Sequence, residues 1–141
     1  MIDLKSILSI GQNAIIRQVV QKADTASNYS NDLNELLATP ACVGMAIKAS
    51  VQTVDQYLPE GLISIGHLTE FTHTAPTSLG MTITVKASII DITDHEVTLK
   101  IEAWDDQGEV GKGIHKRAVV NHEALLKKAR QRTRFLTNRK I

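Results

Sequence analysis

Residues 61–80 read GLISIGHLTEFTHTAPTSLG, one long strand that ends in a turn. Isoleucine, threonine and phenylalanine favour a strand as far as His73, and then Pro76 and Gly80 mark the turn. Because successive side chains of a strand point to opposite faces, the run divides into two sets. One set is His67, Thr69, Phe71 and His73, and the other is Leu68, Glu70 and Thr72. We therefore predict a strand that carries His73 at its end.

His73 is a candidate functional residue because of this position. An imidazole at the end of a strand can titrate near neutral pH, orient a water molecule or polarise a carbonyl group. A histidine that is hydrogen-bonded within a half-buried sheet is the structural alternative. The strand by itself leaves both interpretations open.

A long helix precedes this strand. Thr39 is a good N-cap and Pro40 suits the first helical position, so a helix should begin here. An apolar stripe at three- and four-residue steps then predicts about five turns, and Pro59-Glu60-Gly61 ends them. The stripe consists of Val43, Ile47, Ser50, Val51, Val54 and Leu58. Upstream, residues 13–21 predict a first strand, and residues 22–38 a loop with a short helical turn.

After residue 61 the chain is β-structure. Alternating patterns over 81–91 and 97–103 predict two strands, and a last strand covers about 109–121. Turns are indicated at Asp94-His95 and Asp105–Gly108. Short connections imply an antiparallel sheet, one face of which the helix must cover. The pattern predicts an α+β fold, with a long helix against a five-stranded antiparallel sheet.

Composition narrows the class of protein. A chain of 141 residues with 43% hydrophobic residues fits one domain over 1–141. No run approaches the ~18 apolar residues of a membrane span, and the N-terminus lacks a signal core, so we expect a soluble cytoplasmic protein. Cys42 is the single cysteine, which excludes an internal disulfide and a multi-cysteine metal site. We expect no metal.

Charge is unevenly distributed although the net charge is only +1. Seven lysines or arginines and no acid follow Glu123, whereas the remainder of the chain carries nine basic and 15 acidic residues. This basic helix or tail, about 123–141, suits nucleic acid, a phosphorylated ligand or an anionic surface, and its alternative is a solvated helix. Among five aromatic residues only Phe135 lies among basic ones, so nucleic-acid binding is poorly supported.

Four short motifs resemble the hotdog-fold acyl-CoA thioesterases, and in particular the fluoroacetyl-CoA thioesterase family. They are Leu37–Pro40, Ser64-Ile65-Gly66, Thr72–Ala75 and the Gly-x-His-x-Arg pattern at 113–117. The resemblance runs from about Asn13 to Arg132. It implies a hotdog fold and a hydrolase of small acyl-CoA thioesters. It also implies that coenzyme A is part of the substrate, without a separate cofactor, and that the protein is a homodimer, with a tetramer as the alternative.

The resemblance assigns roles to four residues. Thr39 falls on a catalytic polar residue at the helix N-terminus, where free amides suit a thioester oxyanion. His73 falls on the active-site histidine. Gly66 falls on a glycine that lets the backbone approach the acyl group. Arg117, which shares its strand face with His115, falls on an arginine that can pair with a carboxylate or phosphate.

Ile47 departs from the family, which carries a glutamate eight residues after the threonine. Isoleucine cannot activate water, and loss of a general base typically removes ~10²–10⁴ in rate. His73 with water, Glu35 or Cys42 are candidate substitutes, and for Cys42 the alternative is a buried core residue. The sequence therefore supports a thioesterase with an atypical site, or a non-catalytic hotdog module that binds an acyl-CoA or a related ligand.

Overall fold

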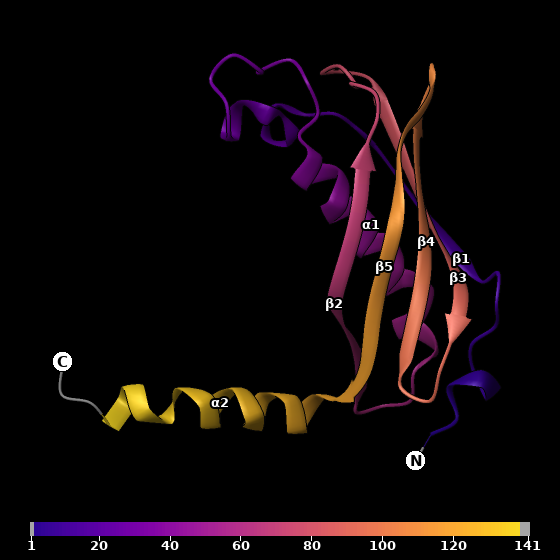
Figure 1. The fold of residues 1–141 in the computed structure, drawn as a ribbon, viewed down its shortest axis with the longest axis vertical. Coiled ribbons are helices and arrows are strands. Elements are labelled where there is room, and N and C mark those ends of the chain that lie inside the picture. The colour runs from indigo at the N-terminus through magenta and orange to yellow at the C-terminus, as the bar shows by residue number, and fades with distance from the viewer. Residues whose placement is uncertain (1, 139–141) are drawn as a thin grey trace.

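The computed structural model describes residues 2–138 (Figure 1). Five strands form one sheet in the order β1-β3-β4-β5-β2, and every neighbouring pair is antiparallel. The long helix α1 lies against this sheet, as the sequence predicts (Figure 1). The elements are β1 (Asn13–Val19), α1 (Thr39–Val54), β2 (Leu62–His73), β3 (Thr82–Ile92), β4 (Glu96–Asp105), β5 (Gly108–Asn121) and α2 (His122–Asn138).

The core lies between α1 and the inner face of the sheet. The predicted alternation of β3 and β4 is confirmed, because every second side chain of each strand is buried. These residues are Ile83, Val85, Ala87 and Ile89 on β3, and Val97, Leu99, Ile101 and Ala103 on β4. Each large aliphatic side chain contributes ~1.5–3 kcal/mol when it is fully buried. The two central strands therefore hold α1 in place.

The predicted apolar stripe of α1 is partly wrong. Ser50 and Val54 are buried, but Ile47 is 37% exposed. The helix turns mainly small side chains toward the sheet, including Ala46 and Ala49, and these allow a close approach. Larger aliphatic residues consequently lie on the flank of the helix. The α-helix also stops after 16 residues, and a 3-10 turn over Asp55–Tyr57 completes the predicted length.

A β-bulge corrects the predicted faces of β2. Gly66 pairs with Arg117, but Leu68 pairs with Lys116, so His67 is an extra residue in the strand. His67 no longer shares a face with Thr69, Phe71 and His73. Its Nε2 instead lies 2.7 Å from the Glu96 carboxylate. A bulge shifts the alternation by one residue, which period-two reasoning does not include.

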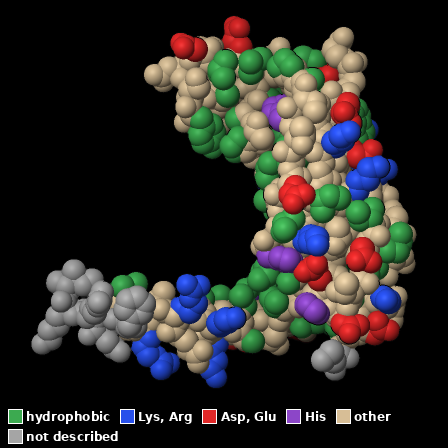
Figure 2. Space-filling view, viewed as in Figure 1, with side chains coloured by type: hydrophobic (Ala, Val, Ile, Leu, Met, Phe, Trp, Pro, Cys, Tyr) green, Lys and Arg blue, Asp and Glu red, His purple; other side chains and the backbone are tan. Residues whose placement is uncertain are grey.

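The molecule has a hollowed, C-like outline beside β2 (Figures 1 and 2). β2 is an edge strand, and its free edge faces this bay. Residues 22–38 project at one end of the bay as two 3-10 turns, Lys22–Asp24 and Ala26–Asn28, rather than the single turn predicted. α2 projects at the other end and confirms a helix in the basic tail, of which residues 139–141 lie outside the described residues. Within residues 2–138 no helix is long and apolar enough to cross a membrane.

Candidate active site

Thr39 and His73 meet where α1 begins and β2 ends. Thr39 Oγ1 lies 2.7 Å from His73 Nδ1, although the residues are 34 positions apart in the chain. The predicted capping role of Thr39 is wrong, because α1 starts at Thr39 and Ala38 is its N-cap. The Thr39 hydroxyl bonds to the imidazole and makes no capping hydrogen bond. Pro40 stands in the first turn as predicted and costs no backbone bond there.

The other nitrogen of the His73 ring is ready to receive a ligand atom. Nε2 is buried and has no hydrogen-bond partner among the described residues. The Phe71 ring lies beside the imidazole, with 6.2 Å between ring centroids. A fixed turn follows, since the Thr74 amide donates to the Val110 carbonyl over 2.7 Å. The imidazole is thus held on one side and presents a free nitrogen on the other, as an acid–base group requires.

Arg117 occupies a second, separate cluster on β2 and β5. The residue is only 5% exposed, so Arg117 is not an ordinary strand-surface arginine. Its Nε donates to Ser64 Oγ over 2.7 Å, and Nη2 donates to the Ser64 carbonyl over 2.8 Å. Ser64 in turn donates its hydroxyl to Asp55. Because arginine can only donate, this order of donors and acceptors is fixed, and Asp55 anchors the guanidinium through Ser64.

His115 completes the cluster and is confined to one tautomer. Its Nε2 lies 3.0 Å from Arg117 Nη1, and a guanidinium cannot accept a hydrogen bond. His115 Nε2 is therefore the acceptor, and Nδ1–H donates to Thr69 Oγ1 over 2.7 Å. Burial lowers the pKa of His115, and the neighbouring Arg117 charge lowers it further. A neutral His115 leaves the Thr69 hydroxyl hydrogen available to a ligand.

Gly66 borders this cluster at close range. A Cβ atom there would stand 2.9 Å from His115 Cε1 and 3.1 Å from Arg117 Nη1. Gly66, Thr69, His115 and Arg117 line an open hollow of about 520 Å³, and Ile47 of α1 forms part of its wall. The hollow thus combines an apolar wall with donors, a lining that fits a short acyl group. The structure brings Gly66 and Arg117 together.

Within one subunit, however, the four predicted site residues fall into two groups. Thr39 and His73 lie at the end of β2, whereas Gly66 lies seven residues earlier on the same strand. At ~3.3 Å per strand residue, roughly 20 Å separates His73 from Gly66. No single small acyl group could contact both groups in one subunit. The spacing of Gly66 and His73 on one predicted strand already implies this separation.

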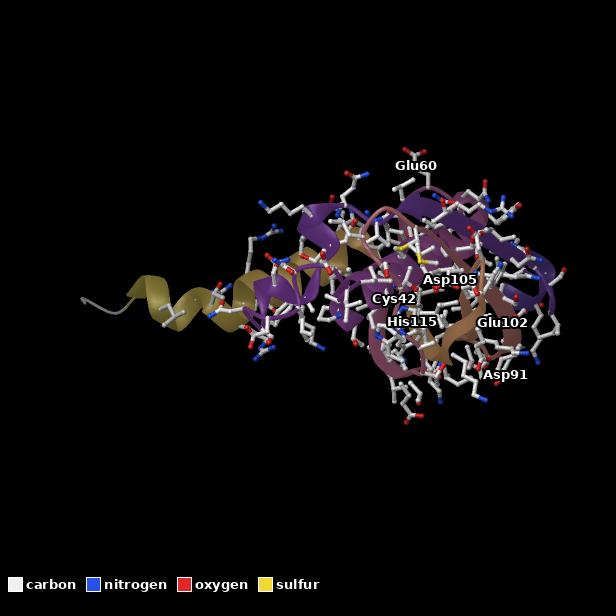
Figure 3. The ribbon with its side chains drawn as sticks, turned by 90° about the horizontal axis from the view of Figure 1, so that it is seen from above. Cys42, Glu60, Asp91, Glu102, Asp105 and His115 are labelled. Carbon is white, nitrogen blue, oxygen red and sulfur yellow. The ribbon has the colours of Figure 1, made fainter. Side chains whose placement is uncertain are left out.

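Two of the candidate substitutes for the missing glutamate lose support. Cys42 is completely buried, and burial raises the pKa of its thiol to about 11, so it matches the core alternative. Figure 3 shows Cys42 and His115 inside the body of the protein, whereas Glu60 lies at its periphery. Glu35 is exposed in the loop before α1, and its side chain makes no hydrogen bond or ion pair with the site residues described. His73 remains the one candidate in place.

Comparison with known proteins identifies the family of this chain. The sequence profile of the fluoroacetyl-CoA-specific thioesterase family, FlK, matches residues 20–123. A fluoroacetyl-CoA thioesterase from Streptantibioticus cattleyicolor is 36% identical over 99 residues, which are 70% of this chain and 71% of that protein. The chain belongs to the FlK family. Most of α2 lies beyond the matched segment.

Solved structures resemble the protein over most of its length. A hot-dog-like protein from Thermanaerovibrio acidaminovorans gives a TM-score of 0.89 at 29% identity, covering 93% of this chain and 97% of that one. A threonine-to-serine variant of the thioesterase FlK, in complex with acetyl-CoA, gives 0.83 at 30% identity, covering 89% and 99%. The hotdog fold predicted from the sequence is confirmed.

Proposed function

We propose that the protein hydrolyses a small acyl-CoA thioester. The observation that carries this proposal is the Thr39–His73 hydrogen bond at the start of α1, with the second imidazole nitrogen buried and without a partner among the described residues. The first turn of a helix carries a partial positive charge. Thr39 and His73 are therefore placed where a thioester carbonyl would find both an oxyanion site and an acid–base group.

The proposed reaction needs only this chain and water. With Nδ1–H donating to Thr39, His73 Nε2 accepts a proton from a water molecule as the water oxygen bonds to the acyl carbon. The carbonyl electron pair moves onto oxygen, where the partial positive charge of the α1 N-terminus stabilises it. Pro40 has no N–H and the amides of Ala41 and Cys42 donate to the Ala38 carbonyl, so these three residues offer the oxygen no free amide. When the pair returns, the carbon–sulfur bond breaks, and the imidazolium gives its proton to the departing coenzyme A thiolate. Acid and free coenzyme A result, without a separate cofactor.

The Gly66–Arg117 hollow is the proposed acyl-binding subsite. Beyond its three hydrogen bonds to Ser64 and His115, the Arg117 guanidinium still has two N–H hydrogens without a partner among the described residues. These hydrogens and the Thr69 hydroxyl suit an electronegative substituent on the acyl group. Ile47 supplies an apolar surface on the opposite wall. The hollow favours a short acyl chain with one polar or electronegative substituent.

A homodimer follows from the separation of the two groups. β2 is an edge strand that no other strand of the subunit covers, and the bay beside it is open (Figure 2). If two β2 strands pair antiparallel around a two-fold axis, the His73 end of one strand lies opposite the first half of the other. Thr39 and His73 of one subunit then face Gly66 and Arg117 of the other. A light-scattering mass near 15.5 kDa at micromolar concentration would contradict the dimer.

Ile47 supports a second candidate function. The family glutamate is replaced by an apolar residue in the wall of the hollow, which fits a hotdog module that binds an acyl-CoA without cleaving it. Steady-state hydrolysis of short acyl-CoAs, measured beside equilibrium binding of coenzyme A, separates the two. Turnover that disappears in His73→Ala supports the hydrolase, whereas tight binding without turnover supports the module. A cytoplasmic location, where acyl-CoA is available, is part of both proposals.

A further inference from the structure

α2 makes few contacts with the subunit that carries it. It begins directly after β5 and extends past the edge of β2, on the side where a second strand would pair with that edge (Figure 1). Its 17 residues span ~25 Å, and it contacts the body mainly through β5 at its start. Leu126 and Leu136 remain 39% and 46% exposed. The helix is therefore placed to contact something outside its own subunit.

α2 is also strongly basic. It carries Lys127, Lys128, Arg130, Arg132 and Arg134, and its one acid, Glu123, stands in the first turn. Residues 2–121 are acidic overall, with nine basic and 14 acidic residues. Within the described residues, no ion pair involves Lys127, Lys128, Arg130 or Arg132. Figure 2 shows the resulting row of positive charge along the helix.

The surroundings of Thr39 and His73 offer few of the cations that coenzyme A requires. Lys48 lines the hollow beside Ala38 and Pro40, and Lys112 pairs with Thr72 on the neighbouring strand. Coenzyme A carries roughly four negative charges at neutral pH, because it contains a diphosphate and a phosphate monoester. The segment 20–38, which leads into Thr39, has Lys22 against the carboxylates of Asp24, Asp32 and Glu35. A ligand of this charge would be repelled there unless cations came from elsewhere.

The geometry of β2 brings α2 to this place in the partner. Leu62, the first residue of β2, pairs with Asn121, so α2 starts next to the beginning of β2. In the β2-paired dimer proposed above, His73 of the other subunit faces Gly66, which lies only four residues, or ~13 Å, from that beginning. We propose that α2 of one subunit binds the phosphates of the acyl-CoA held by Thr39 and His73 of the other. This proposal rests on the proposed function and on the β2-paired dimer.

Two other occupants are less well supported. An anionic membrane would require a broad apolar face, but the apolar stripe of α2 is narrow and is interrupted by Thr133. Nucleic acid would be expected to find several aromatic stacking residues between the cations, and the sequence of α2 holds one phenylalanine, Phe135, and no tyrosine or tryptophan. Coenzyme A needs only cations within reach of the thioester site, which α2 provides.

A charge-reversal variant tests the proposal. Lys127→Glu/Arg130→Glu changes two cations on one helix face, and Lys5→Glu/Arg17→Glu makes the same change at exposed positions away from β2. We expect the α2 variant to raise KM for an acyl-CoA at least fivefold at low salt, with kcat unchanged and the helical circular dichroism retained. KM for the same acyl group on pantetheine, which lacks the nucleotide, should not change. The control variant should match the wild type with both substrates.

A heterodimer shows which subunit supplies the cations. One protomer carries His73→Ala with native α2, and its differently tagged partner carries native His73 with Lys127→Glu/Arg130→Glu. Only the second protomer retains an intact Thr39–His73 pair. If α2 acts across the dimer, the purified heterodimer recovers the wild-type KM. A KM as high as that of the doubly charge-reversed homodimer would overturn the proposal.

Binding of coenzyme A separates this proposal from the proposed function. If the wild type hydrolyses no acyl-CoA, the hydrolase is refuted, but a fivefold weaker binding of coenzyme A to the α2 variant still supports α2. If hydrolysis persists and the α2 variant equals its control in KM and in coenzyme A binding, α2 is refuted alone. Loss of binding to anionic vesicles or to RNA, with coenzyme A binding intact, would also overturn it.

Discussion

Gly66→Ala tests whether the Arg117 cluster is as rigid as its bonds indicate. The added Cβ would stand 2.9 Å from His115 Cε1 and 3.1 Å from Arg117 Nη1, so one of the two groups must move. His115 is held by Thr69 and Arg117 by Ser64, and the simplest relief is to break the 3.0 Å bond between the ring and the guanidinium. Loss of a hydrogen bond to a charged group costs ~1.5–3 kcal/mol, and overpacking itself costs ~1–3 kcal/mol.

We therefore expect the free energy of unfolding to fall by about 2–4 kcal/mol in urea denaturation of Gly66→Ala, allowing for partial relaxation. kcat/KM for an acyl-CoA should fall at least tenfold, because the guanidinium is displaced within the proposed acyl subsite. Binding of free coenzyme A should change little, since coenzyme A has no acyl group to place in the hollow.

Two glycines provide matched controls for the same added methyl group. Gly44 is a helical residue of α1 with open space around it, and Gly44→Ala should stabilise the protein by ~0.5–1 kcal/mol. At Gly113 a Cβ would stand 1.9 Å from the Glu70 carbonyl oxygen, so Gly113→Ala should disrupt the β2–β5 pairing more severely than Gly66→Ala. A Gly66→Ala protein as stable and as active as Gly44→Ala would refute the rigid cluster.

Two further predictions concern the Thr39–His73 pair and His115. Thr39→Ala and His73→Ala should each lower turnover at least tenfold. Thr39→Ala should also lower the free energy of unfolding by ~0.5–1.5 kcal/mol, because it loses the hydrogen bond to His73 although no capping bond is lost. Undiminished turnover in both variants would place the chemistry elsewhere. Burial and the Arg117 charge lower the pKa of His115. Below about pH 6.5 the unfolded chain therefore binds a proton that the folded protein does not bind, and the free energy of unfolding decreases as the pH is lowered. His115→Gln should show a smaller loss between pH 7 and pH 5, and an identical loss would contradict the shift.

The fold could be predicted because its signals are local and repeat along the chain. Alternation in β3 and β4, Pro40 at the start of α1 and short turns between strands each depend on neighbouring residues. The face of α1 was harder to predict, because small side chains such as Ala46 and Ala49 carry little hydrophobic signal although they are the ones that permit close packing. The bulge at His67 likewise has no period of its own.

The site was only partly visible, because its contacts join distant parts of the chain. The resemblance gave Thr39 and His73, but their hydrogen bond spans 34 positions and replaces the cap that local sequence favours. Asp55 reaches Arg117 through Ser64, 53 positions before the arginine, and no spacing rule connects them. A motif can thus name residues that act together without giving the bonds that orient them.

Ile47→Glu asks whether the missing carboxylate limits the proposed activity. Ile47 lines the hollow with Arg117, so a glutamate there would stand near a buried guanidinium. Attraction to that charge lowers the pKa of a carboxyl, and burial raises it, so the two effects oppose each other. Because Ile47 is 37% exposed, the burial penalty is incomplete and the carboxylate should be ionised at neutral pH.

In the proposed dimer, the thioester held by one subunit enters the Gly66–Arg117 hollow of the other. The carboxylate that Ile47→Glu introduces lies in that hollow, where it would take a proton from water. We expect Ile47→Glu to raise the hydrolysis rate of a short acyl-CoA by ~10-fold or more, since a general base contributes ~10²–10⁴ and its placement here is not optimised. Ile47→Gln has nearly the same shape without the base, and it should give no increase. Equal rates in the two variants, in folded dimers, would show that isoleucine is not the limiting residue. In that case Arg117 would hold the new carboxylate in an ion pair, and the resemblance of this site to a carboxylate-assisted thioesterase would be one of fold alone.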